Sequence, residues 1–176
     1  KCFLDMAKLN TYQQKRDFDK TKEPKGDEIT KRSAKRLRFV VQRHHASRLH
    51  YDFRLEMDGV LKSWAIPKGP SLHPQDKRLA VMVEDHPLSY RTFEGEITKG
   101  SYGFGTVTLF DEGYYTPLEK SHGEKELLSE LESGSLKIVL HGKKLKGEFA
   151  LVRMKQAQDD NAWLLLKHKD KYAVEQ

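Results

Sequence analysis

The sequence predicts a mainly β protein built as an antiparallel β-barrel, and three observations support this fold class. Short apolar runs recur along the chain, glycine-containing turns separate them, and a single stretch shows clear helical spacing. Many short strands with tight turns and one helix are typical of a barrel or a sandwich. We expect the barrel to turn a polar face inward as an active-site bowl, with an irregular N-terminal arm, residues 1–38, lying across its mouth.

Alternating and β-branched residues predict nine strands within residues 39–176, which we expect to form a single domain. They cover residues 39–43, 49–56, 60–66, 78–86, 106–110, 114–115, 136–140, 148–153 and 163–167. Asp58-Gly59 is a strong signal for a two-residue hairpin turn. Residues 44–48 are expected to form a connection, and Asp111-Glu112-Gly113 the turn of another hairpin.

Helical structure is expected in two places. Three leucines at helical spacing predict a helix over residues 124–132, and Gly134 follows as its stop. A second, short helix is expected near residues 6–12 in the arm.

The positive charge of the chain is concentrated in the arm. The net charge is +6, and residues 1–38 carry 12 Lys and Arg against 6 Asp and Glu, which leaves 20 of each sign in the body. A basic arm suits a polyanion such as nucleic acid, although a solvated tail has the same composition. One cysteine, no membrane-length apolar run and no secretory pattern predict a cytoplasmic protein with no membrane partner.

One strand carries chemistry on one of its faces. Side chains alternate along a strand, so one face is expected to enter the core: Leu49, Tyr51, Phe53 and Leu55. The other face carries His50, Asp52, Arg54 and Glu56. With His44 just upstream, two imidazoles and a carboxylate fit Mn, Fe, Co or Zn. His45 is the second choice for the first ligand.

Cationic groups near this strand predict an anion site. The expected phosphate-binding residues are Arg54, Lys68, Arg78 and His86. Alternation along residues 78–86 is expected to bring Arg78, Glu84 and His86 to one face. His86 is a candidate proton donor, Glu84 an orienting group and Tyr90 a hydroxyl donor. The alternatives are cross-strand salt bridges for the arginines, a plain turn position for Lys68 and packing for Tyr90.

Several other catalytic schemes lack their residues. The sequence has no phosphate-binding Walker loop, no serine nucleophile elbow, no zinc-finger spacing and no plausible Cys/His nucleophile pair. Some aromatic residues are candidates for a base-stacking platform, although core packing is the expected use of most of them. They are Trp64, Tyr102, Phe104, Tyr114 and Tyr115.

Three long segments carry a family resemblance. They are Val41-Gln42-Arg43-His44-His45 through Arg54-Leu55-Glu56, Leu61-Lys62-Ser63-Trp64 through Lys68-Gly69-Pro70, and Val83-Glu84-Asp85-His86-Pro87 through Ser89-Tyr90. They resemble the 3′-phosphoesterase domain of bacterial DNA ligase D and its stand-alone relatives. The resemblance reaches back through residues 15–24 and forward through residues 100–107 to 163–169, so it covers nearly the whole chain.

The resemblance implies a β-barrel and a Mn²⁺-dependent enzyme, with Co²⁺ or Zn²⁺ as alternative ions. Such an enzyme trims the 3′ end of a DNA primer–template in non-homologous end joining. It removes a terminal ribonucleoside as a phosphodiesterase and then a 3′-phosphate as a phosphomonoesterase, which leaves a 3′-OH for ligation. Ligase and polymerase domains, in the same polypeptide or the same pathway, are the implied partners. The sequence leaves open whether this domain is free-standing.

The resemblance also implies roles for individual residues. His44, His50 and Asp52 would hold the metal ion. The phosphate would be held by Arg54, Lys68, Arg78 and His86, with Tyr90 essential nearby. The diesterase step would depend on Glu84 and on three arm residues, Arg16, Asp17 and Glu23. The arm would then belong to the active site.

Two competing functions remain open from the sequence. One is a binding module that recognises 3′-phosphate DNA ends without turnover, which removal of metal would leave unaffected. The other is a dioxygenase-type barrel, because two His and one Asp also suit Fe(II). That site would not require Arg54 and Arg78 beside the metal.

Overall fold

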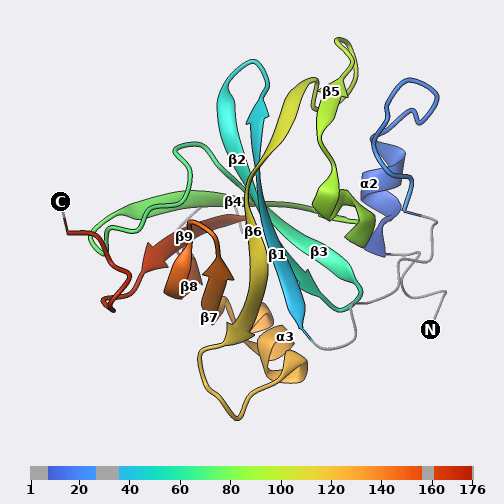
Figure 1. The fold of residues 1–176 in the computed structure, drawn as a ribbon. Helices are drawn as coiled ribbons and strands as arrows, with labels where there is room; N and C mark the ends of the chain where they lie inside the picture. Colours follow the sequence, from blue (N-terminus) through green and yellow to red (C-terminus); the bar gives the residue numbers. More distant parts are fainter. Residues whose placement is uncertain (1–7, 27–35, 156–160, 176) are drawn as a thin grey trace.

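The fold is a closed antiparallel β-barrel. The computed structural model describes residues 8–26, 36–155 and 161–175. Nine strands form one sheet in the order β1-β2-β3-β4-β9-β8-β7-β6-β5, and a further pairing of β1 with β6 closes eight of them into a barrel (Figure 1). The expected fold class, a mainly β antiparallel barrel, is confirmed. No helix in the described part of the chain is both long enough and apolar enough to cross a membrane.

The bounds of the elements agree with most of the expected ones. In chain order they are α2 (Asn10–Gln14), β1 (Leu37–His45), β2 (Leu49–Met57), β3 (Val60–Ile66), β4 (Lys77–His86), the 3₁₀ helix η1 (Leu88–Thr92), β5 (Gly95–Ile97), β6 (Gly105–Pro117), α3 (Glu124–Ser133), β7 (Ser135–Gly142), β8 (Lys146–Arg153) and β9 (Ala162–Lys167). Helix α3 ends at Gly134, whose φ of 82° is the left-handed cap expected from the sequence. In the arm, α2 overlaps the expected helix, of which residues 6 and 7 lie outside the described residues.

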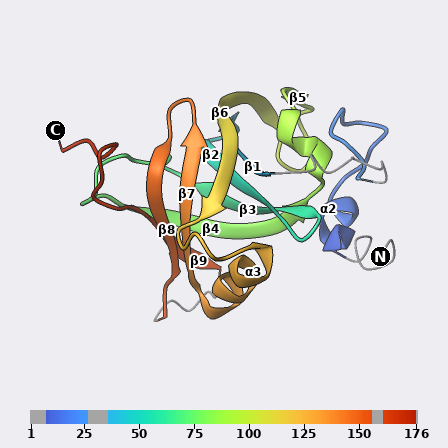
Figure 2. The ribbon, with the colours of Figure 1, turned by 60° about the horizontal axis from the view of Figure 1, so that its bottom comes forward.

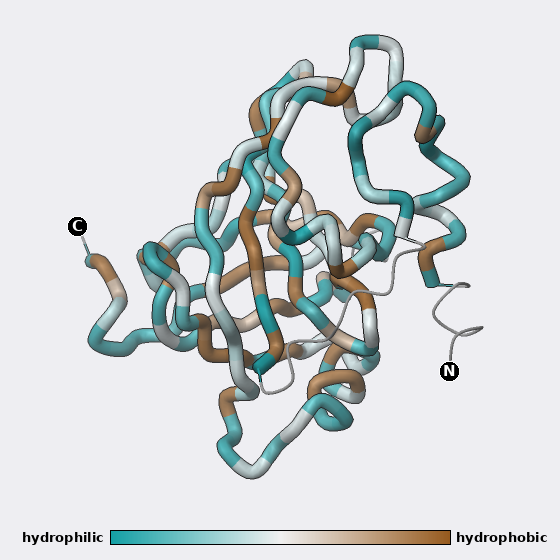
Figure 3. The backbone as a smooth tube through the Cα atoms, turned by 45° about the vertical axis from the view of Figure 1, so that its right-hand side comes forward, coloured by the Kyte–Doolittle hydropathy of each residue, from teal (hydrophilic) through white to brown (hydrophobic). Residues whose placement is uncertain are grey.

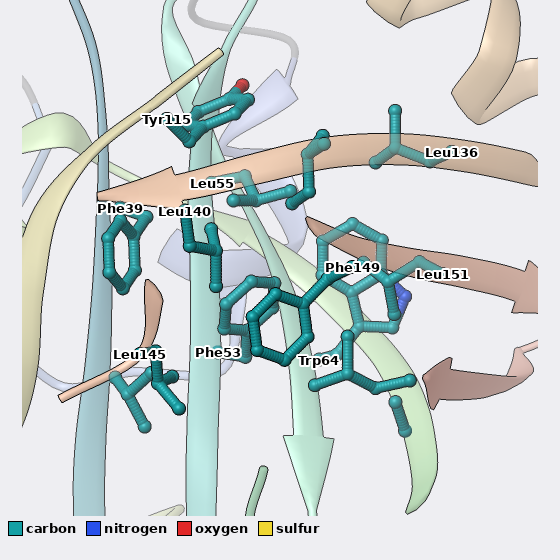
Figure 4. Close-up of a cluster of buried hydrophobic side chains, with 14 of the residues drawn as sticks. Phe39, Phe53, Leu55, Trp64, Tyr115, Leu136, Leu140, Leu145, Phe149 and Leu151 are labelled. Carbon is teal, nitrogen blue, oxygen red and sulfur yellow. The ribbon is translucent and has the colours of Figure 1, made fainter. Parts of the chain in front are cut away.

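The inside of the barrel is apolar, so the expected inward-facing polar bowl is wrong. All eight barrel strands contribute to one buried cluster, which includes Trp163. Figure 4 labels other members, among them Phe39, Phe53, Trp64 and Phe149. Helix α3 lies at one end of the barrel and adds its own leucines to the cluster (Figure 2). The interior of an eight-stranded barrel is just wide enough for side chains, and apolar ones fill it without needing partners.

Strand β1 is longer than expected, and this length matters for the site. The expected strand ended at Arg43, with residues 44–48 as a connection. In the structure the strand continues through His45, and His44 pairs with His50 of β2. The β1–β2 hairpin therefore holds both histidines in a rigid, antiparallel register.

The expected hairpin at Asp111–Gly113 is also wrong, because β6 runs through it as one strand with a bulge. The extra residue lies opposite the step between Val41 and Gln42 of β1. The Asp111 carboxylate accepts hydrogen bonds from three backbone N–H groups of the β7–β8 turn, at 2.7 to 3.2 Å. Asp111, a residue type common in turns, thus stabilises the β7–β8 turn from within strand β6.

A second bulge, in β4, separates residues expected on one face. Val83 pairs with Ser63 and His86 with Leu61, so β4 has one residue more than β3 between these two pairs. The extra residue turns His86 to the outer face. Arg78, in phase with the buried Ala80, lies on the inner face. The expectation that Arg78 and His86 share a face is therefore wrong.

Strand β2 is buried on both faces along most of its length. Phe53 and Leu55 lie in the core as expected, whereas Leu49 at the strand start is 38% exposed. On the opposite face, Asp52 and Arg54 are also buried. Because these polar side chains are buried although they lie on the outer face of the barrel, other segments of the chain must pack over this face.

The N-terminal arm, η1 and β5 provide that cover. A second apolar cluster lies on the outer face and consists of Tyr12, Leu61, Tyr90, Phe93, Ile97 and Val107. Figure 1 shows α2 and β5 on the same side of the barrel, and Figure 3 shows the arm as mostly hydrophilic beside the more hydrophobic barrel strands. The arm therefore encloses polar space against the outer wall.

Candidate functional site

The hairpin of β1 and β2 brings His44, His50 and Asp52 together on the outer wall. His44 Nδ1 lies 3.6 Å from Asp52 Oδ2, and His50 Nε2 lies 3.4 Å from Asp52 Oδ1. One donor atom from each residue lies within 4.8 Å of the others, so the cluster could bind a metal ion. His45 is exposed and alternates to the opposite face, which leaves His44 as the member of this cluster.

Hydrogen bonds orient the two imidazoles. His44 Nε2 lies 3.3 Å from the Phe104 carbonyl oxygen, which can only accept, so this contact fixes the orientation of the ring with Nδ1 on the side of Asp52. The pKa of His50 is raised, chiefly by its hydrogen bond to Asp52. Burial alone would raise the pKa of Asp52, but Arg54 and the two histidines outweigh burial and hold it well below its usual range.

Arg54 lies beside this cluster and has an unsatisfied donor. Its Nη2 is 3.6 Å from Asp52 Oδ2, its Nε donates to Gln42 Oε1 at 2.7 Å, and its guanidinium lies 4.8 Å from the Tyr90 ring centre. Its Nη1 is buried and has no hydrogen-bond partner. A buried guanidinium with a free N–H is suited to an anion, and phosphate offers the matching oxygens.

Gln42 is a residue that the sequence reasoning missed. It is fully buried, accepts from Arg54, and donates to the carbonyl oxygens of Tyr90 and Phe93 at 2.8 and 3.0 Å. It thereby ties β1 to η1 and fixes the Arg54 side chain. The available signal was its position two residues before His44, which puts it on the same strand face.

His86 and Tyr90 lie against Arg54 from β4 and η1. His86 Nδ1 donates to the Glu84 carbonyl at 2.9 Å, and Nε2 faces Arg16 Nη2 at 3.3 Å. Burial, together with Arg54 and Arg16, lowers the pKa of His86 well below its usual value. The ring is therefore a neutral acceptor here, and the proton-donor role expected for it requires that it first gain a proton.

Tyr90 is buried and donates its hydroxyl to Glu23 Oε2 at 2.7 Å. Burial raises the pKa of Tyr90 well above its usual value. The hydroxyl therefore keeps its proton and acts as a hydrogen-bond donor.

The arm contributes buried charges to the same space. Arg16 pairs with Glu23 at 3.1 Å and with Glu84 at 3.4 Å, and its guanidinium lies 3.9 Å from the Tyr12 ring centre. Asp17 is different, because it is exposed and pairs only loosely with Lys20, at 3.7 Å. The structure thus brings Arg16, Glu23 and Glu84 to the cluster, while Asp17 lines a cavity at its edge.

Lys68 and Arg78 do not join the cluster. Lys68 is exposed in the turn after β3, and Arg78 Nη2 lies 3.4 Å from Asp76 Oδ2. Within the described ranges, no hydrogen bond or ion pair links either residue to His44, His50 or Asp52. Arg78 thus forms a salt bridge, but with Asp76 two residues earlier in the chain, and not the expected cross-strand pair with Glu56 or Glu84.

Fold and site together define a class: a β-barrel domain with a candidate metal site and a buried arginine for an anion on its outer wall. The chain belongs to the family of DNA ligase D 3′-phosphoesterase domains, whose family model matches residues 42–153. This confirms the resemblance seen in the sequence. Membership makes the chain a domain of a hydrolase class that acts on phosphate esters, which favours this chemistry over the dioxygenase-type alternative.

Curated relatives support the assignment. The chain is 51% identical, over 92% of its length, to the multifunctional non-homologous end joining protein LigD of Pseudomonas aeruginosa. It is 44% identical, over 93% of its length, to the protein of the same name from Mycolicibacterium smegmatis, and 43% identical over 83% to LigD of Mycobacterium tuberculosis. It spans only about a fifth of each relative, between 18 and 21%.

Proposed function

We propose that this chain is a metal-dependent phosphoesterase of DNA 3′ ends. It would remove a 3′-terminal ribonucleoside as a phosphodiesterase and then the 3′-phosphate as a phosphomonoesterase. The product is a 3′-OH that a ligase can seal during double-strand break repair. The observation that carries the proposal is the convergence of three metal-type donors beside the unpartnered Arg54 Nη1.

The donor set fits a divalent transition ion. Two imidazole nitrogens and a carboxylate suit Mn²⁺, which we propose as the ion, with Co²⁺ and Zn²⁺ as alternatives. His44, His50 and Asp52 would hold it, and the hydrogen bond from His44 to the Phe104 carbonyl already fixes one ring. When bound, the ion supplies Lewis-acid polarisation of a phosphoryl oxygen and a more acidic water.

The protein residues would bind and neutralise the phosphoryl group. Arg54 offers its free buried N–H to a phosphoryl oxygen. The Tyr90 hydroxyl beside it would become a second donor by turning its one proton from Glu23 Oε2 to the phosphate. His86 would accept or donate at a further oxygen, depending on its protonation state. Hydrolysis places the hydroxyl of water on phosphorus and a proton on the departing oxygen. For Lys68 and Arg78, phosphate binding stays a prediction.

We propose that the arm, residues 1–38, contributes to the site on the barrel domain, residues 39–176. Arg16, Glu23 and Glu84 form a buried charge network against His86 and Tyr90, and this contact supports the proposal that they act in the diesterase step. Asp17 is assigned to the same step through its cavity position.

The relatives suggest the setting. Because they are named as end-joining proteins and are about five times longer, ligase and polymerase domains are proposed partners, in the same polypeptide or pathway. A DNA primer–template with a 3′-ribonucleotide or 3′-phosphate end is the proposed substrate. Work on chromosomal DNA would place the protein in the cytoplasm, at the nucleoid.

The test is phosphate release from a 3′-phosphate primer–template. We expect release with Mn²⁺, loss of release with chelator, and loss in His50→Ala, while His122→Ala, a matched histidine outside the site, behaves as wild type. Full activity of His50→Ala would defeat the metal assignment. Tight binding of the DNA end without turnover, unchanged by chelator, would support the binding-module alternative instead.

A further inference from the structure

A cavity of about 200 Å³ lies between the arm and the loop of residues 98–105. Arm residues 15–23 form one wall, and Gly100, Ser101 and Tyr102 form the other. It adjoins the candidate site, because Arg16 in its wall also contacts Glu84 and His86. A pocket of this size is below the about 300 Å³ at which pockets for drug-sized ligands begin, and it suits one compact group.

Tyr102 is an exposed aromatic residue at this cavity. Its side chain is 50% exposed, although most large apolar side chains of the barrel are buried. Lys15 Nζ lies 3.3 Å from its hydroxyl and 4.8 Å from its ring centre, and the Arg16 guanidinium lies 5.6 Å from the ring centre. An open aromatic ring flanked by cations is the arrangement that proteins use to stack a nucleobase beside a phosphate.

The loop that carries Tyr102 is fixed to the candidate metal site. The backbone carbonyl of Phe104 accepts from His44, and a Cβ at Gly103 would lie only 3.8 Å from the His44 ring. Thr98 Oγ1 donates to the Lys20 carbonyl at 3.0 Å, which ties the loop to the arm. Tyr102 is therefore held at a set position between the arm and the metal-type cluster.

We propose that Tyr102 stacks on the base of the 3′-terminal nucleoside and that the cavity holds this nucleoside. The inference rests on the proposed diesterase function, in which this nucleoside is the group released. Stacking accepts any base, because every base has a π-face, so the site would be indifferent to base identity. The Asp17 carboxylate and the Ser101 hydroxyl, both in the cavity wall, offer partners for sugar hydroxyls.

This assignment separates the two proposed reactions. In the diester the phosphorus carries the terminal nucleoside, and hydrolysis breaks that phosphorus–oxygen bond and returns a proton to the nucleoside oxygen. The 3′-phosphate monoester has no group beyond the phosphate to enter the cavity. Loss of the Tyr102 ring should therefore weaken binding of one substrate relative to the other.

The experiment compares KM for two primer–templates, one with a 3′-terminal ribonucleoside and one with a 3′-phosphate. In Tyr102→Ala we expect the ratio of the diester KM to the monoester KM to rise about 5- to 150-fold, the range for loss of one base–aromatic stack. Tyr102→Phe keeps the ring and should keep a near wild-type ratio. With an abasic terminal riboside, wild type and Tyr102→Ala should give the same ratio. Tyr172→Ala, at an exposed tyrosine outside the cavity, is the matched control.

The outcomes distinguish the two hypotheses. An unchanged ratio in Tyr102→Ala, or an equal penalty on the abasic substrate, would overturn the stacking assignment while the proposed function stands. A wild-type protein that releases neither nucleoside nor phosphate with Mn²⁺ would overturn the proposed function itself.

Discussion

The two faces of the same strands, β1 to β4, follow different rules. The inner face presents Phe53 and Trp64 to a core filled by apolar side chains. The outer face presents Gln42, Asp52 and Arg54, which are also buried, beneath the arm and η1. The inner face is stabilised by volume and apolar area, whereas the outer face depends on pairing each polar group.

The difference between the faces shows that the polar groups of the candidate site lie on the outer wall of the barrel. Most described core side chains are apolar and need no hydrogen-bond partner, and the indole N–H groups of Trp64 and Trp163 have none. On the outer wall many charged groups are paired, and among the buried donors that have no partner in the described residues, Arg54 Nη1 lies beside the metal-type cluster. A buried donor without a partner lowers the stability of the fold, and a bound ligand can supply the missing acceptor. Such donors are therefore expected at binding sites.

The largest expected effect on activity comes from Asp52→Asn, on the outer face. It removes a proposed metal ligand and the charge that Arg54 and both histidines share, with almost no change in volume. We expect phosphoesterase activity to fall roughly 10³- to 10⁴-fold, since Lewis-acid stabilisation is worth several kcal/mol. Metal-binding calorimetry and phosphate release measure the effect. Activity within tenfold of wild type would contradict the assignment.

The corresponding change on the inner face is Trp64→Ala. Trp64 is fully buried and packs edge-on against Trp163, with ring centres 5.8 Å apart. We expect the free energy of unfolding to fall by about 3–5 kcal/mol, while the folded fraction keeps its activity. Urea denaturation gives the first quantity and activity at low temperature the second. Trp64→Phe should cost far less, because the phenyl ring leaves a much smaller cavity and the indole N–H makes no hydrogen bond in the described structure.

Gln42→Met tests whether the outer face depends on hydrogen bonds beyond the metal cluster. The substitution keeps most of the volume but removes the acceptor for Arg54 and the two N–H donations to the Tyr90 and Phe93 carbonyl oxygens. We expect activity to fall about 10- to 100-fold, as is typical when a group that orients a site residue is lost. Gln75→Met, on an exposed loop, is the control. Wild-type activity in Gln42→Met would show that Arg54 is positioned by packing alone.

Gln42 also shows how far the sequence could lead. Alternation predicted that His50 and Asp52 share a face, whereas His44 was expected in a connection and was chosen for its residue type and its nearness in the chain. The structure adds the hairpin register that pairs His44 with His50 and completes the metal-type cluster. Gln42 lies on the same face, but its partners are backbone carbonyls 48 and 51 residues away in η1 and beyond. Such contacts depend on the closed fold and leave no periodic pattern.

The errors have a shared physical origin in bulges and tertiary partners. Asp111-Glu112-Gly113 has turn chemistry, yet tertiary hydrogen bonds from the β7–β8 turn place it in a bulged strand. The bulge in β4 reverses the face of His86 relative to Arg78, which strict alternation cannot predict. Likewise, the sequence of a strand with one apolar and one polar face does not determine which face lies inside the barrel, which is why the polar bowl was expected inside.

A charge that lies on the inner side of the barrel sharpens the comparison further. Lys167 on β9 is fully buried, and its Nζ lies 2.8 Å from Asp170, with the Phe149 ring centre 5.1 Å away. A buried charge should require an ionic partner on the inner side just as on the outer wall. Asp170→Asn should therefore lower the stability of the fold and leave the phosphoesterase activity unchanged. We expect a loss of about 1 to 2 kcal/mol, below the roughly 3–5 kcal/mol for a fully buried pair, because Asp170 keeps some exposure.

The pH dependence of this variant gives the sign of the effect. Burial alone would raise the pKa of Asp170, but Lys167 and the backbone N–H groups of Glu148 and Tyr172 outweigh burial and lower it. A carboxyl whose pKa is lower in the folded state stabilises the fold above the unfolded pKa, near 3.8, and loses this contribution as the pH falls further. Urea denaturation should therefore show the full gap between wild type and Asp170→Asn at pH 7 and a smaller gap at pH 3. Asp19→Asn, on the exposed arm, should show no gap at either pH, and a gap for Asp170→Asn that is equal at both pH values would mean that the ionised carboxylate is not what stabilises Lys167.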